Sequence, residues 1–308
     1  MLTSIFLHAK SDSYVMISKK RQKILLIGSG GRVGRIISHY WAQMLPPSLS
    51  FIRQGRAPDW LTDSNLLQWD PTNGPAPLCA WIDQFGPIDV MLVLSGVVPA
   101  PGCDLSLNSA IAQACLEGAM AAGIRRVLLT SSSAVYGAHQ TLPFKETDLT
   151  RPVNAYGQEK LKMESLGQSY ASYDLEVCAL RIGNVAGADA LLLNIAKSTP
   201  SEIIEIDVFD DGRGPVRSYI GGRTLAEVLL SLCLYPPPLP PVLNIGTPQP
   251  VSMDALADAA GQPWRARTAA SPSMQNITLD CSLLASLHSF VAQDSDPADM
   301  IQQWKESA

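Results

Sequence analysis

From Lys23 onward, short runs of apolar residues alternate with longer segments in which apolar residues recur every three or four positions. Short apolar runs are typical of buried strands, whereas the wider spacing indicates amphipathic helices. Regular alternation of the two predicts an α/β fold, in which helices cover a parallel sheet. The expected strands are residues 23–28, 49–54, 89–95, 125–131, 175–181 and 241–246.

Two segments have the most regular helical pattern. Residues 105–123 repeat Ala, Leu and Ile at helical spacing, and the terminal Gly123 suits a helix C-cap. A second helix is expected to follow Asn154 and to run from about Tyr156 to Tyr173. Both helices lie between expected strands, as a sheet covered by helices requires.

The pattern divides the chain into three parts. Residues 1–20 precede the first strand and form an N-terminal extension, and residues 21–187 carry most of the strand and helix pattern. Residues 188–308 have fewer long helical patterns and form a smaller lobe, some elements of which return to the main sheet. The proline tract at 235–241 is interpreted as a stiff connector, with a ligand for an aromatic-lined groove as the alternative.

Composition narrows the class of protein. The chain has 308 residues, of which 46% are apolar, and its 23 basic and 28 acidic residues give a net charge of −5. Because the longest basic run is the short "KKRQK" at 19–23, nucleic acid is excluded as an expected partner. No apolar stretch reaches the ~18 residues that cross a bilayer, and the N-terminus lacks the features of a signal peptide. A cytoplasmic protein without a membrane partner is therefore expected.

The cysteines are scattered and show no metal-ligand spacing, so no metal site is expected and most are interpreted as buried thiols. They are Cys79, Cys103, Cys115, Cys178, Cys233 and Cys281.

The stretch "IGSGGRVG" places Gly28, Gly31 and Gly34 three residues apart, directly after a strand and at the start of a helix. In that context the first glycine permits a tight turn, the second lets a pyrophosphate approach backbone N–H groups, and the third allows close helix packing. A plain strand-to-helix turn is the alternative. The motif predicts dinucleotide binding by a Rossmann-type, doubly wound parallel sheet with a smaller C-terminal substrate-binding lobe. The remaining expected cofactor contacts in this turn are Gly30, Arg32 and Val33.

The end of the second strand bears on the choice of cofactor. An acidic residue there would bind the ribose of NAD, but the chain has "FIRQGR", with Arg53 and Arg56. These arginines, together with Arg32, favour the 2′-phosphate of NADP, and NAD is the alternative. Asp70 follows the third apolar run, where it is expected either to contact the adenine amine or to begin a turn before Pro71.

Tyr156 and Lys160 stand four residues apart in "NAYGQEKLKMES", a spacing that places both on one helix face. The pKa of a phenol, about 10, falls beside an ammonium group, so Tyr156 is expected to act as a general acid or base near neutral pH. Chance pairing at this spacing is the alternative.

A strand also ends on hydroxyl groups, in "TSSSAVYG" at 130–137. A serine hydroxyl at such a strand end is expected to hydrogen-bond the alcohol or carbonyl oxygen of a substrate.

Five motifs in order make the chain similar to the extended branch of the short-chain dehydrogenase/reductase family, which contains NAD(P)-dependent epimerases, dehydratases and reductases. The likeness runs from Lys23 to Gly246. The motifs are GxxGxxG at 28–34, Asn108 in "SLNSA", "SSSAVYG" at 131–137, YxxxK at 156–160 and "LRIGNVAG" at 180–187.

The resemblance implies roles for the central residues. Tyr156 would be the acid/base, Lys160 would lower its pKa and hold the nicotinamide ribose, and Ser132 would orient the reacting oxygen. Asn108 would support Lys160 through water. Relatives commonly pair through the helices that follow Asn108 and the YxxxK motif, so a homodimer is expected.

The resemblance also implies a substrate site. Ser133 and Asn184 would lie near the substrate, and Arg217 stands where sugar-nucleotide members bind the nucleotide phosphate. The His-Val-x-Asp that follows in those members is Gly-Gly-Arg-Thr here, at 221–224, which puts the nucleotide end of the substrate in doubt. Dehydratases carry an acidic pair where this chain has Ser133 and Ala134, so dehydration is disfavoured.

The resulting hypothesis is an NAD(P)-dependent oxidoreductase or epimerase that transfers hydride at a secondary alcohol or ketone of a sugar or sugar nucleotide, a small-molecule substrate. Two alternatives stay open. One is a reductase of a non-sugar ketone, and the other is a non-catalytic NADP(H)-binding sensor or scaffold.

Overall fold

The computed structural model describes residues 22–56, 64–139, 143–172, 174–270 and 273–308. The N-terminal extension 1–20 expected from the sequence lies outside the described residues.

A parallel sheet forms the centre of the larger lobe. Its strands are β1 (Gln22–Ile27), β2 (Leu49–Gly55), β3 (Leu66–Gln68), β4 (Val90–Val93), β5 (Arg126–Ser132), β6 (Glu176–Ile182) and β11 (Val242–Ile245). They form one 7-stranded sheet in the order β11-β6-β5-β4-β1-β2-β3, and every pairing is parallel. All six predicted strands are confirmed within one to two residues, and β3 is added. The strand order reverses between β1 and β4, where a parallel sheet opens a crevice at its carboxyl edge.

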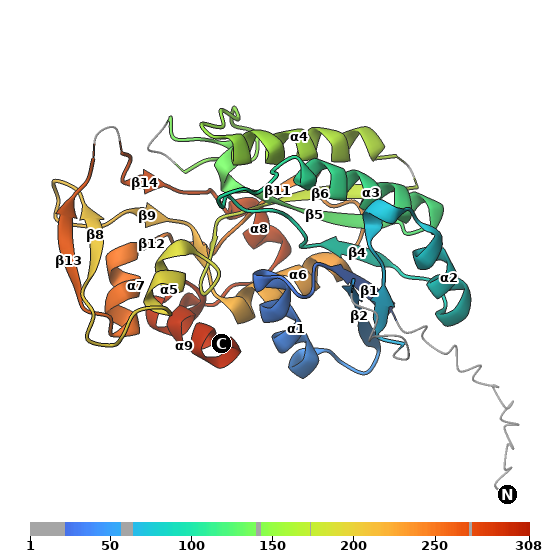
Figure 1. Cartoon of the computed structure of the whole chain (residues 1–308), viewed down its shortest axis with the longest axis horizontal. Coiled ribbons are helices and arrows are strands. Elements are labelled where there is room, and N and C mark those ends of the chain that lie inside the picture. Colours follow the sequence, from blue (N-terminus) through green and yellow to red (C-terminus); the bar gives the residue numbers. More distant parts are fainter. Residues whose placement is uncertain (1–21, 57–63, 140–142, 173, 271–272) are drawn as a thin grey trace, which may run out of the picture.

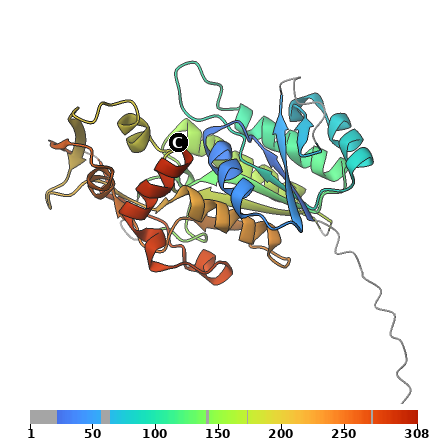
Figure 2. The ribbon, with the colours of Figure 1, turned by 90° about the horizontal axis from the view of Figure 1, so that it is seen from below.

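Helices cover both faces of this sheet (Figure 1). One face carries α2 (Ala76–Phe85), α3 (Leu107–Ala121) and α4 (Ala155–Tyr170), and the other carries α1 (Arg32–Met44) and α6 (Gly222–Leu234). Figure 2 shows α1 in blue and α6 in orange side by side on the same face of the sheet. The two predicted helices are confirmed as α3 and α4, apart from shorter ends; Tyr173 lies outside the described residues.

Local signals explain where these helices begin and end. Asn154 caps α4, because its side chain accepts a hydrogen bond from the Gly157 N–H at 2.8 Å. Gly123 follows the end of α3 with a φ of +68°, the left-handed backbone that glycine adopts readily.

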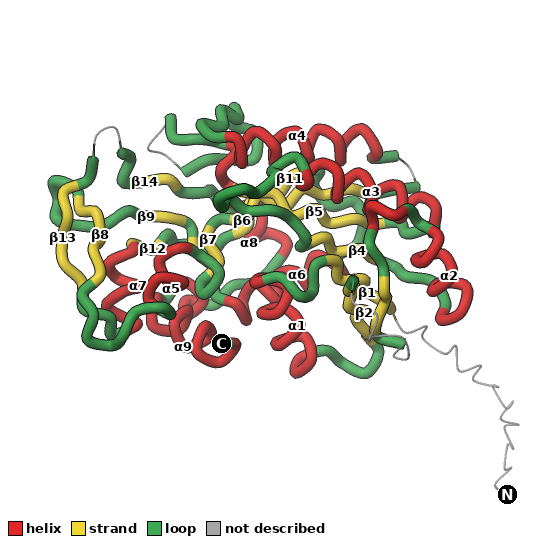
Figure 3. The backbone as a smooth tube through the Cα atoms, in the orientation of Figure 1, coloured by secondary structure: helices red, strands yellow, loops and turns green. Residues whose placement is uncertain are grey.

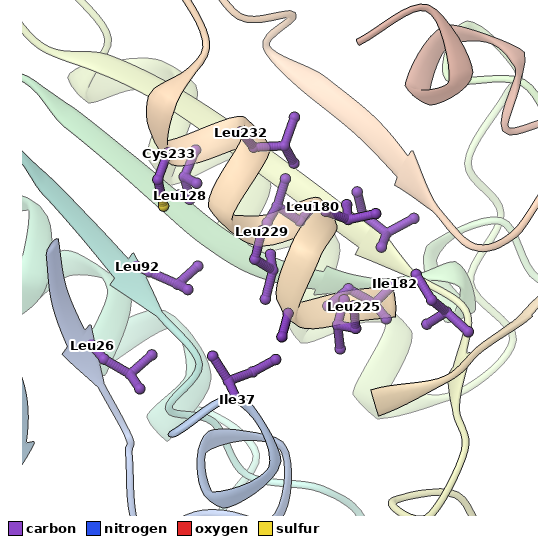
Figure 4. Close-up of a cluster of buried hydrophobic side chains, with 14 of the residues drawn as sticks. Leu26, Ile37, Leu92, Leu128, Leu180, Ile182, Leu225, Leu229, Leu232 and Cys233 are labelled. Carbon is purple, nitrogen blue, oxygen red and sulfur yellow. The ribbon is translucent and has the colours of Figure 1, made fainter. Parts of the chain in front are cut away.

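Apolar side chains fill the space between α6 and the sheet. Figure 4 shows Leu225, Leu229 and Leu232 of α6 pointing toward Leu128 and Leu180 of the strands, and all five are fully buried. Burying one leucine contributes about 1.5–3 kcal/mol. This packing ties α6, which comes late in the sequence, to the larger lobe.

The smaller lobe combines short strands and helices, at the left of Figure 3. Its main elements are α5 (Ala190–Ile195), β8 (Ile204–Val208), β9 (Val216–Arg217), β12 (Val251–Ser252), α7 (Met253–Ala260), β13 (Trp264–Thr268), β14 (Asn276–Ile277) and α9 (Pro297–Ser307). The elements β7 (Asn184–Val185), β10 (Tyr219–Ile220) and α8 (Ser282–Leu287) lie beside the larger lobe. Because α6 packs on the main sheet and β11 belongs to it, the chain leaves the larger lobe and returns to it. The proline tract at 235–241 joins α6 to β11.

Among the described residues, no helix has the length and apolar character needed to cross a membrane. The same residues contain no cluster of three or more His, Cys, Asp or Glu side chains suited to a metal ion. Most cysteines are buried thiols, as predicted; the buried ones are Cys115, Cys178, Cys233 and Cys281.

Candidate active site

The glycine turn after β1 leaves room for close approach to its backbone. Gly28 has a φ of +82°, and its carbonyl accepts a hydrogen bond from the Gly31 N–H at 3.0 Å. A Cβ on Gly34 would lie 2.1 Å from the Gly28 oxygen, so only glycine allows α1 to start here. A Cβ on Gly30 would have no heavy atom within 4 Å, which leaves that side of the turn open.

This open side faces a crevice of about 520 Å³ at the edge of the sheet where the strand order reverses between β1 and β4. Of the expected turn residues, Gly28, Gly30 and Gly31 line it, whereas Arg32 and Gly34 do not, and Val33 packs against the core beneath α1. The lining includes Gly28, Gly30, Gly31, Gln54, Arg56, Asp70, Thr72, Gly96, Leu107 and Ile111.

Arg53 and Arg56, the two arginines near the end of β2 that were predicted to bind the cofactor phosphate, line different hollows. Arg56 lines the crevice, whereas Arg53 lines a different hollow, between β2 and α1. The alternation of a strand explains this, because Arg53 points to the same face as Phe51, toward α1. The structure therefore does not bring Arg53 to the crevice, contrary to the prediction.

Gln54 occupies the strand end where NAD-binding relatives would carry an acid, and its role was not predicted. Its Oε1 accepts a hydrogen bond from the Gly28 N–H at 3.0 Å, and its Nε2 donates to the Trp69 carbonyl at 2.5 Å. The side chain is buried and neutral. The glutamine at the end of "FIRQ" was the available signal.

Asp70 begins a turn, one of the two roles expected from the sequence, and it also borders the crevice. Its Oδ1 accepts hydrogen bonds from the backbone N–H and hydroxyl of Thr72 at 3.1 and 2.7 Å, which makes it a turn residue. It also lines the crevice, 4.0 Å from the guanidinium of Arg56.

Ser132 and Tyr156 meet at the end of β5. Ser132 is the last residue of that strand, and its hydroxyl hydrogen-bonds the phenol of Tyr156 from the first turn of α4. Burial raises the pKa of Tyr156, while Ser132 and the charge of Arg32 oppose that rise. The predicted shift of this pKa toward neutrality is wrong, because the cost of burying a phenolate outweighs both opposing contributions.

Lys160 is buried beside them and borders the crevice. Its Nζ donates to the Thr130 carbonyl at 2.7 Å, and it lies 5.9 Å from the centre of the Tyr156 ring. A Cβ on Gly96, in the crevice wall, would come within 3.2 Å of this Nζ. Burial lowers the pKa of Lys160 to about 8, although the charge of Glu164 opposes the shift.

Asn108 holds the loop between β4 and α3. Its Oδ1 accepts a hydrogen bond from the Val97 N–H at 3.1 Å, and its Nδ2 donates to the carbonyls of Val97 and Leu105 at 3.0 Å each. A Cβ on Gly96 would lie 2.8 Å from that Oδ1. Asn108 thus shapes the stretch of crevice wall that Lys160 borders.

Arg32, at the start of α1, contacts the loop that follows β7. The guanidinium of Arg32 donates to the Ala188 carbonyl at 3.2 Å, which directs this arginine toward the smaller lobe. Asn184 in β7 hydrogen-bonds the Tyr219 hydroxyl. Ser133 begins the short turn after β5, next to Ser132.

Arg217 and the segment after it line up differently from the expectation for sugar-nucleotide members. The half-buried Arg217 side chain donates to the carbonyls of Val216 and Gln275 at 2.7 and 2.6 Å, and it makes no ion pair within the described ranges. A Cβ on Gly221 would lie 2.2 Å from Oε1 of Gln303 in α9. That oxygen accepts a hydrogen bond from the Arg223 N–H at 2.8 Å, so Gln303 covers the start of α6.

Two relatives that match this chain in sequence cover about half of it. A 176-residue segment is 30% identical to UDP-glucose 4-epimerase of Azospirillum brasilense, covering 54% of this chain and 50% of that protein. The chain thus spans about half the length of that relative. The NAD-dependent glucose-6-phosphate dehydrogenase of Haloferax volcanii is 28% identical over 186 residues, which are 53% of this chain and 69% of that protein.

Solved structures share the whole fold. The UDP-glucose 4-epimerase of Brucella ovis, in complex with NAD, superposes with a TM-score of 0.74 at 20% identity, covering 92% of this chain and 97% of the other. The UDP-Glc/GlcNAc 4-epimerase of Campylobacter jejuni gives a TM-score of 0.75 at 19% identity, covering 93% and 99%.

A family model matches residues 24–230, from the first strand through α6. This span contains the glycine turn, the Ser132 and Tyr156 pair, and Lys160. The chain belongs to the NAD dependent epimerase/dehydratase family.

Proposed function

We propose that this chain is an NAD(P)-dependent oxidoreductase or epimerase that transfers hydride at a secondary alcohol or ketone of a sugar or sugar nucleotide. One observation carries the proposal. Ser132, Tyr156 and Lys160 meet at the end of β5, and Lys160 borders the glycine-lined crevice through Gly96. A protein that only senses a dinucleotide has no chemical need for this trio.

In the proposed reaction, the Tyr156 phenol donates a proton to a substrate carbonyl oxygen, or in the reverse direction its phenolate accepts one from a substrate alcohol. The Ser132 hydroxyl, which hydrogen-bonds the Tyr156 phenol, orients the reacting oxygen of the substrate. Because burial raises the pKa of Tyr156, its neutral phenol persists at neutral pH and suits proton donation. Lys160 contributes a positive charge on the same helix face.

The crevice fits a dinucleotide, because the turn at Gly28 and the open face of Gly30 leave backbone accessible beside the start of α1. When bound, a nicotinamide cofactor supplies the hydride donor or acceptor. NADP is proposed over NAD because the acid that would contact a ribose hydroxyl is replaced by the neutral Gln54, and Arg56 lines the same crevice.

The substrate class follows from the relatives. Their names describe action on UDP-glucose and on glucose 6-phosphate, so a phosphorylated or nucleotide-linked hexose is proposed. Arg217, which has no carboxylate partner among the described residues, would bind a phosphate of that substrate. Epimerisation additionally requires the ketone to turn over in the pocket and take the hydride back on its other face.

A reductase acting on a substrate without a nucleotide is the second candidate. Its support is the contact between Gly221 and Gln303, which replaces a family motif with helix packing at the nucleotide end. A homodimer through the outer faces of α3 and α4 is also proposed. Light scattering on the purified chain tests it, and a monomer at micromolar concentration would contradict it.

The test of function begins with fluorescence titration by NADPH and NADH. The preferred dinucleotide is then incubated in its oxidised form with UDP-glucose, UDP-galactose and glucose 6-phosphate, and in its reduced form with simple ketones. Net cofactor turnover indicates an oxidoreductase, and interconversion of UDP-glucose and UDP-galactose without net turnover indicates an epimerase. Tight cofactor binding with no chemistry across the panel would contradict the proposal and favour a sensor.

A further inference from the structure

Three consecutive residues at the end of β5 are each held by a side chain from one face of α4. The contacting residues of α4 are four positions apart, which aligns them along a single face. The pairs are Tyr156 with Ser132 through their hydroxyls, Lys160 with the Thr130 carbonyl at 2.7 Å, and Glu164 Oε1 with the Ser131 hydroxyl at 2.5 Å. Two of these α4 side chains belong to the proposed chemistry. The third, Glu164, has no assigned role.

Glu164 is buried and firmly held. The guanidinium of Arg181 in β6 donates to both of its carboxylate oxygens, with Nη2 at 2.8 Å from Oε2 and Nε at 3.0 Å from Oε1. Their side chains are only 5% and 6% exposed. Arg181 also donates to the Tyr136 hydroxyl at 2.8 Å, and that hydroxyl donates to Oδ1 of Asn244 in β11 at 2.8 Å.

This network reaches the segments on both sides of Ser132. Ser131 precedes Ser132 in the strand, and Tyr136 ends the short turn that follows it. A buried ion pair is not in itself evidence of stabilisation, because removing two charges from water offsets much of their attraction. Its cost is understandable if the pair holds the catalytic end of β5 in register with α4.

Glu164 also places a negative charge near Lys160. The other groups that face the Lys160 ammonium are the Tyr156 ring, the sulfur of Met163 at 3.9 Å, the Thr130 carbonyl and, through Gly96, the Asn108 amide. None of these groups is a carboxylate. Burial lowers the pKa of Lys160 to about 8, and Glu164 is the group that opposes the shift.

We infer that Glu164 is a positioning residue for the proposed reaction: it fixes Ser132 against Tyr156 through Ser131, and it places a negative charge one helix turn from Lys160. The inference rests on the proposed function for its kinetic consequences. Glu164 is not proposed to contact substrate or cofactor. Ser131, which precedes Ser132 in β5, is proposed to align the end of the strand.

Two variants test the inference, each with a matched control. Glu164→Gln removes the charge at nearly constant shape, and Glu176→Gln does the same to a partly buried pair, in which Glu176 binds Arg126 at 2.5 Å at the far end of the sheet. Ser131→Ala removes the hydroxyl, and Ser109→Ala removes another serine-to-glutamate hydrogen bond, 3.0 Å long, between α3 and α4. All four are assayed as the full chain saturated with the cofactor in the oxidation state that the reacting substrate requires.

The expected results separate positioning from general stability. Ser131→Ala should lower kcat about tenfold with KM nearly unchanged, whereas Ser109→Ala should leave kcat within about twofold. Glu164→Gln should shift the alkaline limb of the pH profile about one unit lower, because Lys160 loses its proton more readily. Glu176→Gln should leave that limb in place. If Glu164→Gln does not fold, Ser131→Ala with its control decides the matter.

Ionisation of Lys160 is also measured without turnover, by ¹³C NMR titration of protein labelled at lysine Cε, with Lys160→Met for assignment. A lower pKa of Lys160 in Glu164→Gln, but not in Glu176→Gln, supports the inference even if no substrate in the panel reacts. In that case only the proposed function fails. An unchanged Lys160 titration and equal kcat for Ser131→Ala and Ser109→Ala would overturn the inference.

Discussion

The two lobes use motifs of the same family in different ways. In the larger lobe, residues that stand apart in the sequence meet at the ends of β1 and β5, where Ser132 contacts Tyr156 and Lys160 borders the crevice. At the junction with the smaller lobe, residues 221–224 at the start of α6, which align with the family's His-Val-x-Asp, pack against α9 because Gln303 covers Gly221. The comparison shows that Ser132, Tyr156 and Lys160 lie together in the larger lobe, whereas residues 221–224 are engaged in packing against α9.

The largest effect is expected for Tyr156→Phe, in the larger lobe. Only the hydroxyl is lost, so turnover should fall by about 10²- to 10⁴-fold while the dissociation constant for NADPH stays within about twofold. Steady-state kinetics and fluorescence titration measure the two quantities. Near-normal turnover would refute the acid/base role.

Lys160→Met is expected to lower turnover, by less than Tyr156→Phe does, yet stabilise the fold. Burial lowers the pKa of Lys160 from 10.5 to about 8, so below pH 8 the folded chain carries a costly buried charge that the unfolded chain does not. The variant should be more stable by about 1–3 kcal/mol at pH 7. The difference should shrink between pH 8 and 10.5, as the folded wild type releases this proton first. Urea unfolding at several pH values checks this, and a destabilised variant at pH 7 would contradict it.

Arg56→Gln tests the cofactor end of the larger lobe. Loss of this cation should weaken NADPH binding about tenfold and leave NADH binding nearly unchanged. Arg53→Gln is the matched control, because Arg53 lies in a different hollow and should have little effect on either cofactor. An equal loss of NADPH affinity in both variants would contradict the assignment of the phosphate contact to Arg56 rather than Arg53.

The smallest effect is expected in the smaller lobe, for Arg217→Gln. If Arg217 binds a substrate phosphate, KM for UDP-glucose should rise about tenfold while kcat changes little. Unchanged KM, combined with activity on substrates that lack a nucleotide, would favour the second candidate function.

The sequence predicted the parts of the molecule that depend on local signals. Runs of apolar residues located the strands, Asn154 marked the start of α4, and the spacing of Tyr156 and Lys160 placed them on one face. Alternation along β2 was also readable, and it would have separated Arg53 from Arg56.

What the sequence did not predict depends on contacts between distant segments. Gln303 is 80 residues beyond the Arg223 N–H that it covers, and no local pattern links them. Arg181 lies in an apolar strand and Glu164 in a helix that carries several other charged residues, and only the fold shows that they pair. The raised pKa of Tyr156 likewise follows from burial, which residue spacing does not reveal.

The most direct test of the central claim mixes purified wild-type chain and Tyr156→Phe with NADP and each sugar of the panel, and follows fluorescence of the reduced nicotinamide. The account predicts reduced cofactor, transient or lasting, in the wild type with one sugar class, and almost none in Tyr156→Phe at equal cofactor occupancy. Equal reduction in both proteins, or none in either despite bound cofactor, would contradict it.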